Sequence, residues 1–372
     1  MSTNTPTADT VRGQAIGSLL RPAPLVSAQR DFRAGRIPVT ALKAAEDRAV
    51  DEALRLQEAA GLDVVNDGEM RRTSFMDHLL ATVPGALGHE APIEAEAPAE
   101  AGGTYAVDNP IAVVEPVTAG RNIGAEEYVY LRGRTDRPVK VTVPSPLMLY
   151  AFWSAERTAP VYPDPFDLFG AWTDLLRRQI EELAALGCTR VQIDAPDMAI
   201  LVDEEQRRQR EALGISVERT LAEGCALIDS LAAVPGVTVS LHLCKGNFRS
   251  MWAASGGYDW LAERIFARTP HVDTYLLEFD DERSGGFAPL AALPEDKRVV
   301  LGLVSTKRED LEPLDALLAR VDEAARHVDR ERIGVSPQCG FASVAAGANH
   351  VTPAAQAAKL FRVAETAAAL RG

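Results

Sequence analysis

Three residues with metal-binding side chains stand near the ends of apolar, strand-like segments. His242 and Cys244 lie two residues apart at the end of one segment, and Cys339 follows another. Because side chains alternate between the two faces of a strand, His242 and Cys244 point to the same side. Imidazole and thiolate are preferred ligands of zinc, and Glu278, at the end of a third segment, would add a carboxylate. The sequence therefore predicts a zinc site formed by His242, Cys244, Glu278 and Cys339.

The His-x-Cys motif alone does not establish a metal site. A two-residue motif recurs by chance, and a buried histidine beside two unrelated core cysteines is the better explanation of the motif taken by itself. The position of all four residues at strand ends favours the metal instead. Structural zinc sites usually use pairs of cysteines clustered in loops, so ligands from three strands favour a catalytic site.

Glu69 and Asp194 place two carboxylates after two further strand-like segments. Either residue has a simpler interpretation, because a carboxylate near a helix start or a strand end often binds only backbone N–H groups. Beside a metal, two carboxylates could bind the ammonium group of a substrate. Arg71, Arg72 and Lys245 would then bind its carboxylate, although exposed basic side chains usually contact only solvent.

The elements that must position these residues alternate between strand and helix. Eight short β-rich segments can be recognised, at 15–19, 62–66, 139–143, 190–194, 237–244, 274–279, 298–304 and 332–336. Between most of them apolar residues recur three and four apart, most clearly in 41–60, 165–185, 216–232, 260–267, 314–327 and 353–370. Eight such units predict an α/β fold, a (β/α)8 TIM barrel, with a doubly wound sheet as the alternative. A barrel builds its active site at the C-terminal strand ends, where the candidate residues stand.

One stretch interrupts this alternation between the second and third strands. Residues 84–138 are rich in Ala, Glu, Pro and Gly, and only weak alternation appears around 112–114 and 128–131. The stretch is interpreted as an insertion, either a hairpin or lid over the barrel mouth or a surface excursion. Residues 1–12 are expected to be a disordered lead-in, and 13–372 a single zinc-binding barrel.

The composition excludes several classes of protein. The chain has 39 Lys and Arg against 53 Asp and Glu, a net charge of -14, which opposes binding to nucleic acid or anionic lipid. No apolar run approaches the roughly 20 residues of a membrane span, and the N-terminus lacks the pattern of a secretory signal. Four cysteines are too few for a disulfide scaffold, and Cys188 and Cys225 are expected to be core residues. We therefore expect a cytoplasmic protein, and the sequence does not indicate its oligomeric state.

Several strings resemble the catalytic C-terminal barrel of cobalamin-independent methionine synthase, in the same order along nearly the whole chain. They are Ile16-Gly17-Ser18-Leu19, the segment 61–69, Val191-Gln192-Ile193-Asp194-Ala195-Pro196, His242-Leu243-Cys244, Leu277-Glu278 and Ser336-Pro337-Gln338-Cys339-Gly340. The closest likeness is to the short, single-barrel members of that family. These share Gly246-Asn247-Phe248-Arg249-Ser250 and the segment 280–285.

The resemblance implies roles for individual residues. It makes His242, Cys244, Glu278 and Cys339 the zinc ligands, and Ile16, Ser18, Glu69 and Asp194 the homocysteine-binding residues, with Glu69 and Asp194 as catalytic carboxylates. Zinc would bind the substrate thiol as thiolate near neutral pH, although a free thiol has a pKa of about 8.5. The sulfur would then attack an electrophilic carbon and give methionine, and Glu278 would be the ligand most easily displaced by the thiol.

Two departures from the long synthases concern the methyl donor. The chain has no room for their second, N-terminal barrel, and the segment 303–307 lacks the histidine that they place after strand seven. The methyl or alkyl donor is therefore left open. Alternatives within the superfamily are a zinc-dependent thiol:epoxide transferase or a carbon–sulfur lyase. A non-catalytic zinc- or thiol-binding barrel is the alternative from a different class.

Overall fold

The structure, a computed structural model, describes residues 11–82, 87–88, 95–96, 106–107, 111–345 and 348–371. The expected lead-in 1–12 therefore lies almost wholly outside the described residues, and so does most of the first half of the expected insertion 84–138.

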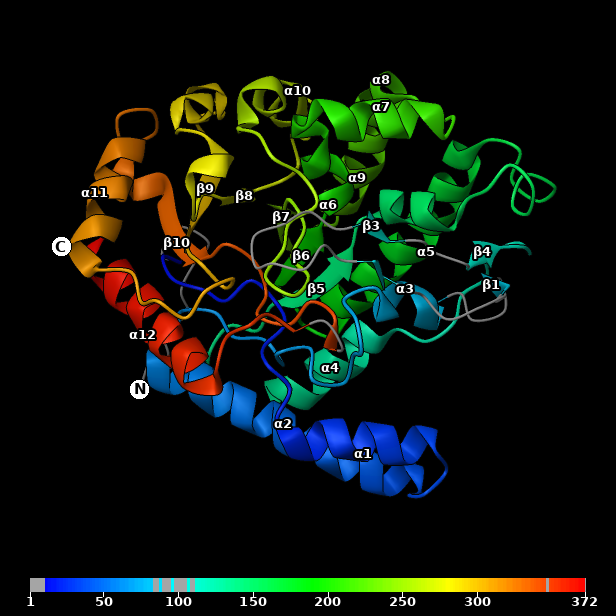
Figure 1. Cartoon of the computed structure of the whole chain (residues 1–372), viewed down its shortest axis with the longest axis horizontal. Coiled ribbons are helices and arrows are strands. Elements are labelled where there is room, and N and C mark those ends of the chain that lie inside the picture. The colour runs from blue at the N-terminus through cyan, green and yellow to red at the C-terminus, as the bar shows by residue number, and fades with distance from the viewer. Residues whose placement is uncertain are drawn as a thin grey trace.

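Six parallel strands form the central sheet, and each pairs with the next one along the chain (Figure 1). They are β5 (Val141–Pro144), β6 (Arg190–Asp194), β7 (Thr238–Leu243), β8 (Thr274–Glu278), β9 (Arg298–Val304) and β10 (Ile333–Pro337). Every residue of β5, β8 and β10 is buried, as expected for strands of a parallel sheet covered by helices. The predicted α/β fold with a parallel sheet is confirmed.

The first two predicted strands are reduced to single parallel bridges. Gly13 pairs with Val335 of β10, Gln14 pairs with Val64, and Val65 pairs with Val139 just before β5. The segments 13–14 and 64–65 thus lie between the two edge strands of the sheet and complete the circuit of eight. The first lies just before the predicted strand 15–19, whose own residues form no bridge, and the second is shorter than the predicted 62–66.

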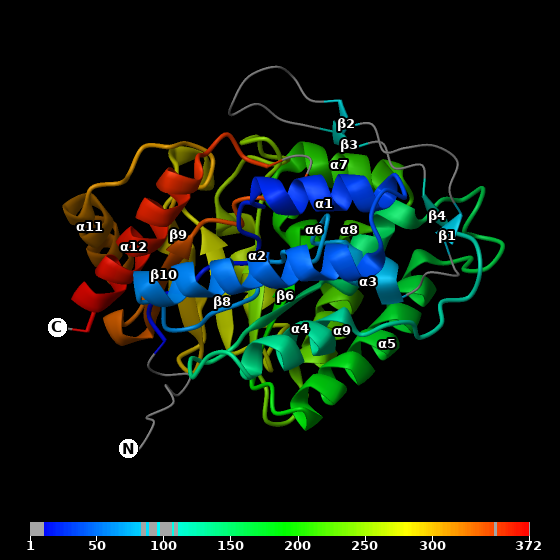
Figure 2. The ribbon, with the colours of Figure 1, turned by 90° about the horizontal axis from the view of Figure 1, so that it is seen from below.

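Helices surround the sheet (Figures 1 and 2). They are α1 (Ala23–Arg33), α2 (Val39–Ala60), α3 (Asp77–Thr82), α4 (Ile123–Arg132), α5 (Pro165–Ala185), α6 (Pro196–Ala199), α7 (Glu204–Ala212), α8 (Val217–Arg219), α9 (Cys225–Ala232), α10 (Ala262–Phe266), α11 (Leu314–Ala324) and α12 (Pro353–Ala369). A π-helical turn joins α8 to α9, so the predicted helix 216–232 is nearly continuous. None of the described helices combines the length and apolar character needed to cross a bilayer.

Helix α5 shows how sequence determines an element of the barrel. Asp164 caps its N-terminus, because the side chain accepts a hydrogen bond from the backbone N–H of Phe166, and Pro165 occupies the first turn. Trp172, Leu176 and Ile180 are fully buried on one face. Their four-residue spacing places them on one side of the helix, which is buried in the hydrophobic core.

The segment expected to be an insertion contains one element of the barrel. Helix α4 contacts α5 and β5 and buries Tyr128 and Leu131, so the weak alternation around these residues belongs to a helix and not to a strand. Before it, β1 (Leu87–Gly88) pairs with β4 (Ala112–Val113), and β2 (Ala95–Glu96) pairs with β3 (Ala106–Val107), both antiparallel. Figure 2 shows β2 and β3 at the periphery of the molecule.

Candidate metal and thiol-binding site

The carboxyl ends of the strands bring the predicted metal and substrate residues to one edge of the sheet. Asp194, the last residue of β6, lies in register with His242 of β7. Cys244 directly follows β7, Glu278 ends β8, and Cys339 stands two residues after β10. The predicted zinc ligands and Asp194 therefore gather at neighbouring strand ends.

His242, Cys244 and Cys339 form a buried group whose ligand atoms all lie within 4.8 Å of one another. The two sulfur atoms are 3.2 Å apart. Within the described part of the chain, no second group of three His, Cys, Asp or Glu side chains has such spacing. Three of the four predicted ligands are thus brought together.

Asp194 orients the imidazole of His242. Its Oδ1 lies 2.9 Å from Nδ1 of His242. The other ring nitrogen, Nε2, lies 3.4 Å from the carbonyl oxygen of Gln338. Gln192 donates to the same Oδ1 at 2.6 Å. Burial opposes the imidazolium, but the hydrogen bond to Asp194 and the charge of Cys339 raise the pKa of His242. A carboxylate that binds the outer nitrogen of a metal-binding histidine is a common supporting group in zinc sites.

The two thiols share a hydrogen bond and therefore ionise unequally. The hydrogen bond from Cys244 lowers the pKa of Cys339 to about 7, against the effect of burial and with the help of His242. The same hydrogen bond, together with burial, raises the pKa of Cys244 well above its ordinary value. The pair thus loses one proton readily, and a divalent cation would favour the loss of the second.

Glu278 is fully buried, but its carboxylate faces cations instead of the three grouped ligands. Oε1 accepts hydrogen bonds from Arg283 and from Lys307, the latter at 3.0 Å, and Oε2 accepts from the backbone N–H of Lys245 at 3.0 Å. Burial alone would raise the pKa of Glu278, but Lys307, Arg283 and Lys245 lower it well below its usual range. The side chain expected to be the fourth ligand is therefore held as an anion beside the site.

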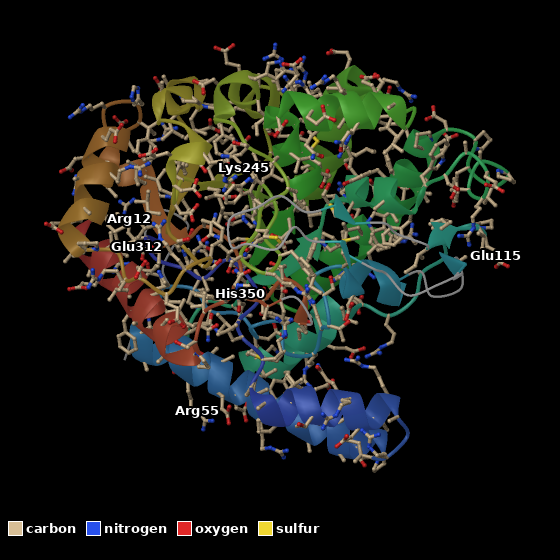
Figure 3. All side chains as sticks on the ribbon, in the orientation of Figure 1. Arg12, Arg55, Glu115, Lys245, Glu312 and His350 are labelled. Carbon is tan, nitrogen blue, oxygen red and sulfur yellow. The ribbon has the colours of Figure 1, made fainter. Side chains whose placement is uncertain are left out.

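Two of the three basic residues considered for a substrate carboxylate are engaged elsewhere. Arg72 forms a two-pronged ion pair with Glu127 at 2.8 and 2.6 Å, and Arg71 binds Asp47 at 2.6 Å. The third, Lys245, is fully buried inside the ring of helices (Figure 3). Its Nζ lies 4.1 Å from the centre of the Tyr258 ring and has no hydrogen-bond partner among the described residues.

Glu69 is a buried carboxylate with one oxygen unused. Oε1 accepts a hydrogen bond from the Thr142 hydroxyl at 2.8 Å, whereas Oε2 has no partner among the described residues. Burial raises the pKa of Glu69, partly offset by Arg72, and the nearby charge of Asp194 raises it further. The backbone of Glu69 is left-handed, with φ 55°. Gly17 leaves room for the Glu69 side chain, because a Cβ at position 17 would lie only 2.8 Å from Oε1 of Glu69.

Ser18 lies directly against the metal-site loop. Its carbonyl accepts from the backbone N–H of Phe341 at 2.7 Å, and a Cβ at Gly340 would collide with the Ser18 side chain. The other predicted substrate residue, Ile16, is buried and clusters with Leu276 and Val300. Ser18 therefore adjoins Gly340, the residue after Cys339, whereas Ile16 packs among apolar side chains of the strands.

Several polar partners of the site were not predicted from the sequence. Thr142 binds Glu69, and Arg283 and Lys307 bind Glu278. Arg283 stands in the 280–285 segment that marks the short family members, which was the available signal. Thr142 lies inside β5, where nothing in the sequence distinguishes it from other strand residues.

The donor set fits a zinc ion. One imidazole and two thiols lie close together, the imidazole is oriented through its outer nitrogen, and soft sulfur donors with imidazole are the ligands that zinc prefers. The carboxylate of Glu278 on the neighbouring strand would be the fourth donor only after exchanging one of its present partners for the metal.

Comparison with known proteins identifies the family. Residues 12–360 match the family described as "Cobalamin-independent synthase, Catalytic domain". The chain belongs to this family. The predicted membership of the cobalamin-independent methionine synthase family is thus confirmed.

Individual relatives agree with this assignment. The chain is 33% identical to the uncharacterized protein YxjH of Bacillus subtilis over 363 residues, which cover 96% of this chain and 93% of YxjH. It is 24% identical to methionine synthase of Pyrococcus abyssi over 327 residues, covering 88% and 85% of the two chains. A B12-independent methionine synthase from Shewanella sp. W3-18-1, solved in complex with selenomethionine, has the same fold, with a TM-score of 0.74, 17% identity, and coverage of 97% and 98%.

Proposed function

We propose that this family member is a zinc-dependent methyltransferase that methylates the sulfur of a small amino-acid thiol. Homocysteine is the expected substrate and methionine the expected product. His242, Cys244, Cys339 and Glu278 would hold the zinc. A bound zinc would keep a substrate thiol deprotonated near neutral pH, so that its sulfur is nucleophilic.

The observation that carries the proposal is the unused oxygen of Glu69. This buried carboxylate lies close enough to Asp194 for the charge of Asp194 to raise its pKa, and Asp194 in turn binds His242 of the metal group. A buried carboxylate oxygen without a partner is costly, and an ammonium group would satisfy it. Glu69 therefore favours a thiol that carries an amino group.

The chain's own residues would then have distinct tasks. Glu69 would bind the substrate ammonium group, Asp194 would orient His242 and add negative charge, and the buried surroundings would exclude water from the sulfur. In the reaction a bond forms between the sulfur and the methyl carbon. The bond from that carbon to the donor breaks, its electrons leave with the donor, and the thiol proton passes to solvent.

The loop after β9 bears on the methyl donor. The segment after β9 carries Lys307, which binds Glu278 and Asp280, where the long synthases place a histidine. The relatives support an amino-acid product, since the Shewanella enzyme binds selenomethionine, the selenium analogue of methionine.

Zinc-edge X-ray absorption with and without thiols tests the proposal together with turnover assays. Homocysteine should add one sulfur to the zinc coordination, and methionine should form with at least one of several methyl donors. Reaction only between an epoxide and a thiol without an amino group would identify the thiol:epoxide transferase instead. Zinc binding without any turnover would favour the non-catalytic barrel.

A further inference from the structure

Three loops at the carboxyl ends of the strands meet at one hydroxyl group, that of Thr306. Thr306 follows β9 and is fully buried. Its Oγ1 accepts from Nδ2 of Asn247 at 3.2 Å, from Nδ2 of Asn349 at 3.1 Å and from Nε2 of Gln338 at 2.9 Å. The same hydroxyl lies 3.1 Å from the carbonyl oxygen of Gly340, to which it donates. Asn247 comes from the loop after β7, and the other three residues follow β10.

The hydroxyl of Thr306 is used to its full capacity. A hydroxyl has one proton and two lone pairs, so the three amide groups share its acceptor sites while its proton serves Gly340. The backbone N–H of Thr306 also donates to Oε1 of Gln338 at 2.6 Å. Because these groups are buried, removing the hydroxyl would leave several polar atoms without a partner.

The residues that bind Thr306 are the near neighbours of the two thiols. Asn247 lies three residues after Cys244, and Gln338 and Gly340 flank Cys339 on both sides. Asn247 also donates directly to the carbonyl of Gly340 at 2.6 Å. The loop of one thiol is therefore tied to the loop of the other both directly, through Asn247, and through the side chain of Thr306 in the loop after β9.

The same network holds a strained turn. Arg249 and Ser250 both have positive φ, 49° and 63°, between Phe248 and Met251. The backbone N–H of Ser250 donates to Oδ1 of Asn349 at 2.9 Å, so the amide that reaches Thr306 also fixes this turn. Such a conformation persists only when its surroundings determine it, which indicates that the loop after β7 is held rigidly.

We propose that Thr306 is a positioning residue, whose hydroxyl fixes the spacing of Cys244 and Cys339 and so sets the zinc affinity of the site. The inference rests on the proposed zinc site and adds to it a residue that is not itself a ligand. Residues that orient metal ligands through hydrogen bonds typically change metal affinity by about ten- to a hundred-fold. Thr306 acts through the loops, so we expect an effect near ten-fold.

The experiment compares Thr306→Val and Thr306→Ser in the full chain. Valine keeps the shape of threonine and removes the hydroxyl, whereas serine keeps the hydroxyl. Zinc affinity is measured by competition with a chromophoric chelator, and cobalt(II) replaces zinc to report thiolate coordination through its charge-transfer absorption. Thr306→Val should bind zinc about ten-fold more weakly and change the cobalt spectrum. Thr306→Ser should match the wild type within about two-fold.

Thr269→Val is the matched control. Thr269 is also fully buried, and its hydroxyl binds the carbonyl of Ile265 at 2.8 Å and the Tyr275 hydroxyl at 2.7 Å. It precedes β8 and so lies at the opposite end of the barrel from the thiols. This variant should lose thermal stability but retain zinc affinity. If Thr306→Val does not fold, Asn349→Ala takes its place in the experiment. This variant removes one of the three amides and should weaken zinc binding by less than is expected for Thr306→Val.

The outcomes separate this inference from the proposed function. A wild-type protein that binds no zinc would overturn the proposed function itself. Equal zinc affinity and identical cobalt spectra for the wild type and Thr306→Val would overturn only the role of Thr306. Equal losses in Thr306→Val and Thr269→Val would also overturn it, because the effect would then follow from general destabilisation.

Discussion

Asp194 binds the outer nitrogen of His242, with 2.9 Å between Oδ1 and Nδ1. A residue that the family resemblance assigns to the substrate therefore also supports a candidate metal ligand. Within the described part of the chain Glu69, the other carboxylate, forms no hydrogen bond or ion pair with His242, Cys244 or Cys339. Substrate binding and metal binding should thus respond differently to changes at these two residues.

Replacing Cys244 or Cys339 by serine should remove zinc and leave the barrel folded. The purified wild type is expected to contain about one zinc per chain, and a serine hydroxyl is a much poorer ligand than a thiolate. Metal analysis and circular dichroism check this prediction. Full zinc occupancy in Cys339→Ser would exclude Cys339 as a ligand, and wholesale unfolding would indicate a structural site.

Glu69→Gln should raise the KM for homocysteine by about ten- to a hundred-fold, because a charge-assisted hydrogen bond contributes roughly 1.5 to 3 kcal/mol. Zinc content should not change. The control substrate is 2-mercaptoethanol, which has no amino group and whose poor reactivity should hardly respond. Equal losses with both thiols would mean that Glu69 does not bind the ammonium group.

Asp194→Asn should impair metal binding as well as substrate binding. Its amide keeps the shape of the carboxylate but loses the charge that orients and supports His242, so zinc affinity should fall by about ten- to a hundred-fold. Chelator competition on Asp194→Asn and Glu69→Gln measures the difference. If the two variants bind zinc equally well, the contact between Asp194 and His242 has no effect on the metal.

Stability should fall in mild acid because of His78. Burial and the nearby Arg72 lower the pKa of His78 to about 3. Below its ordinary pKa near 6.5 the unfolded chain binds a proton that the folded chain does not. The stability that neutral His78 contributes is thus present above about pH 6.5 and is lost as pH falls toward 3, by about 1.4 kcal/mol per unit.

Urea unfolding at pH 7 and pH 5 measures this effect, which amounts to about 2 kcal/mol over that interval. His78→Gln keeps a donor for Gln179, which accepts from His78 Nε2 at 2.9 Å, and removes the titration. The variant should therefore show a smaller loss between the two pH values. The same loss in both proteins would assign the acid sensitivity to other groups.

Arg249→Gly should stabilise the protein. Arg249 has φ 49°, which is strained for any residue with a side chain, and glycine adopts this conformation freely. We expect the free energy of unfolding to rise by about 0.5 to 1 kcal/mol. Gly61→Ala is the opposite case: Gly61 has φ 87° at the end of α2, and a Cβ there would meet only Ala364 at 3.9 Å. Gly61→Ala should therefore lower the free energy of unfolding by about 1 kcal/mol through backbone strain alone. Urea unfolding measures both variants, and a lower free energy of unfolding in Arg249→Gly would contradict the prediction.

The fold could be predicted where apolar periodicity was strong. Helix α5 has the predicted bounds Pro165–Ala185, and β9 has the predicted bounds Arg298–Val304. Helix α7 was missed because Glu204–Ala212 is almost entirely polar and buries only Arg210. Helix α4 was missed because it lies in a stretch of mixed composition, although the three-residue spacing of Ala125, Tyr128 and Leu131 was a helical signal.

For the candidate site, the sequence could predict the kinds of ligand but not the contacts that hold them. The two-residue spacing of His242 and Cys244 places both on one side of β7, and strand order brings Cys339 close. The contact between Asp194 and His242 depends on the register between β6 and β7, which a single sequence does not encode. The ammonium group of Lys307, which binds Glu278, comes from another loop 29 residues along the chain. Local sequence patterns could therefore not predict this ion pair.

The three bridges that complete the circuit of strands have a consequence for synthesis of the chain. Gly13 pairs with Val335, so the first segment finds its partner only after almost the whole chain has been made. Until then the segment 13–14 has an open edge on the side where β10 will pair, and so has the strand made last; an open parallel edge can pair with another chain. Contacts over such sequence separations also form slowly. We therefore expect nascent or C-terminally truncated chains to aggregate and to require chaperones, whereas the completed circuit has no open edge.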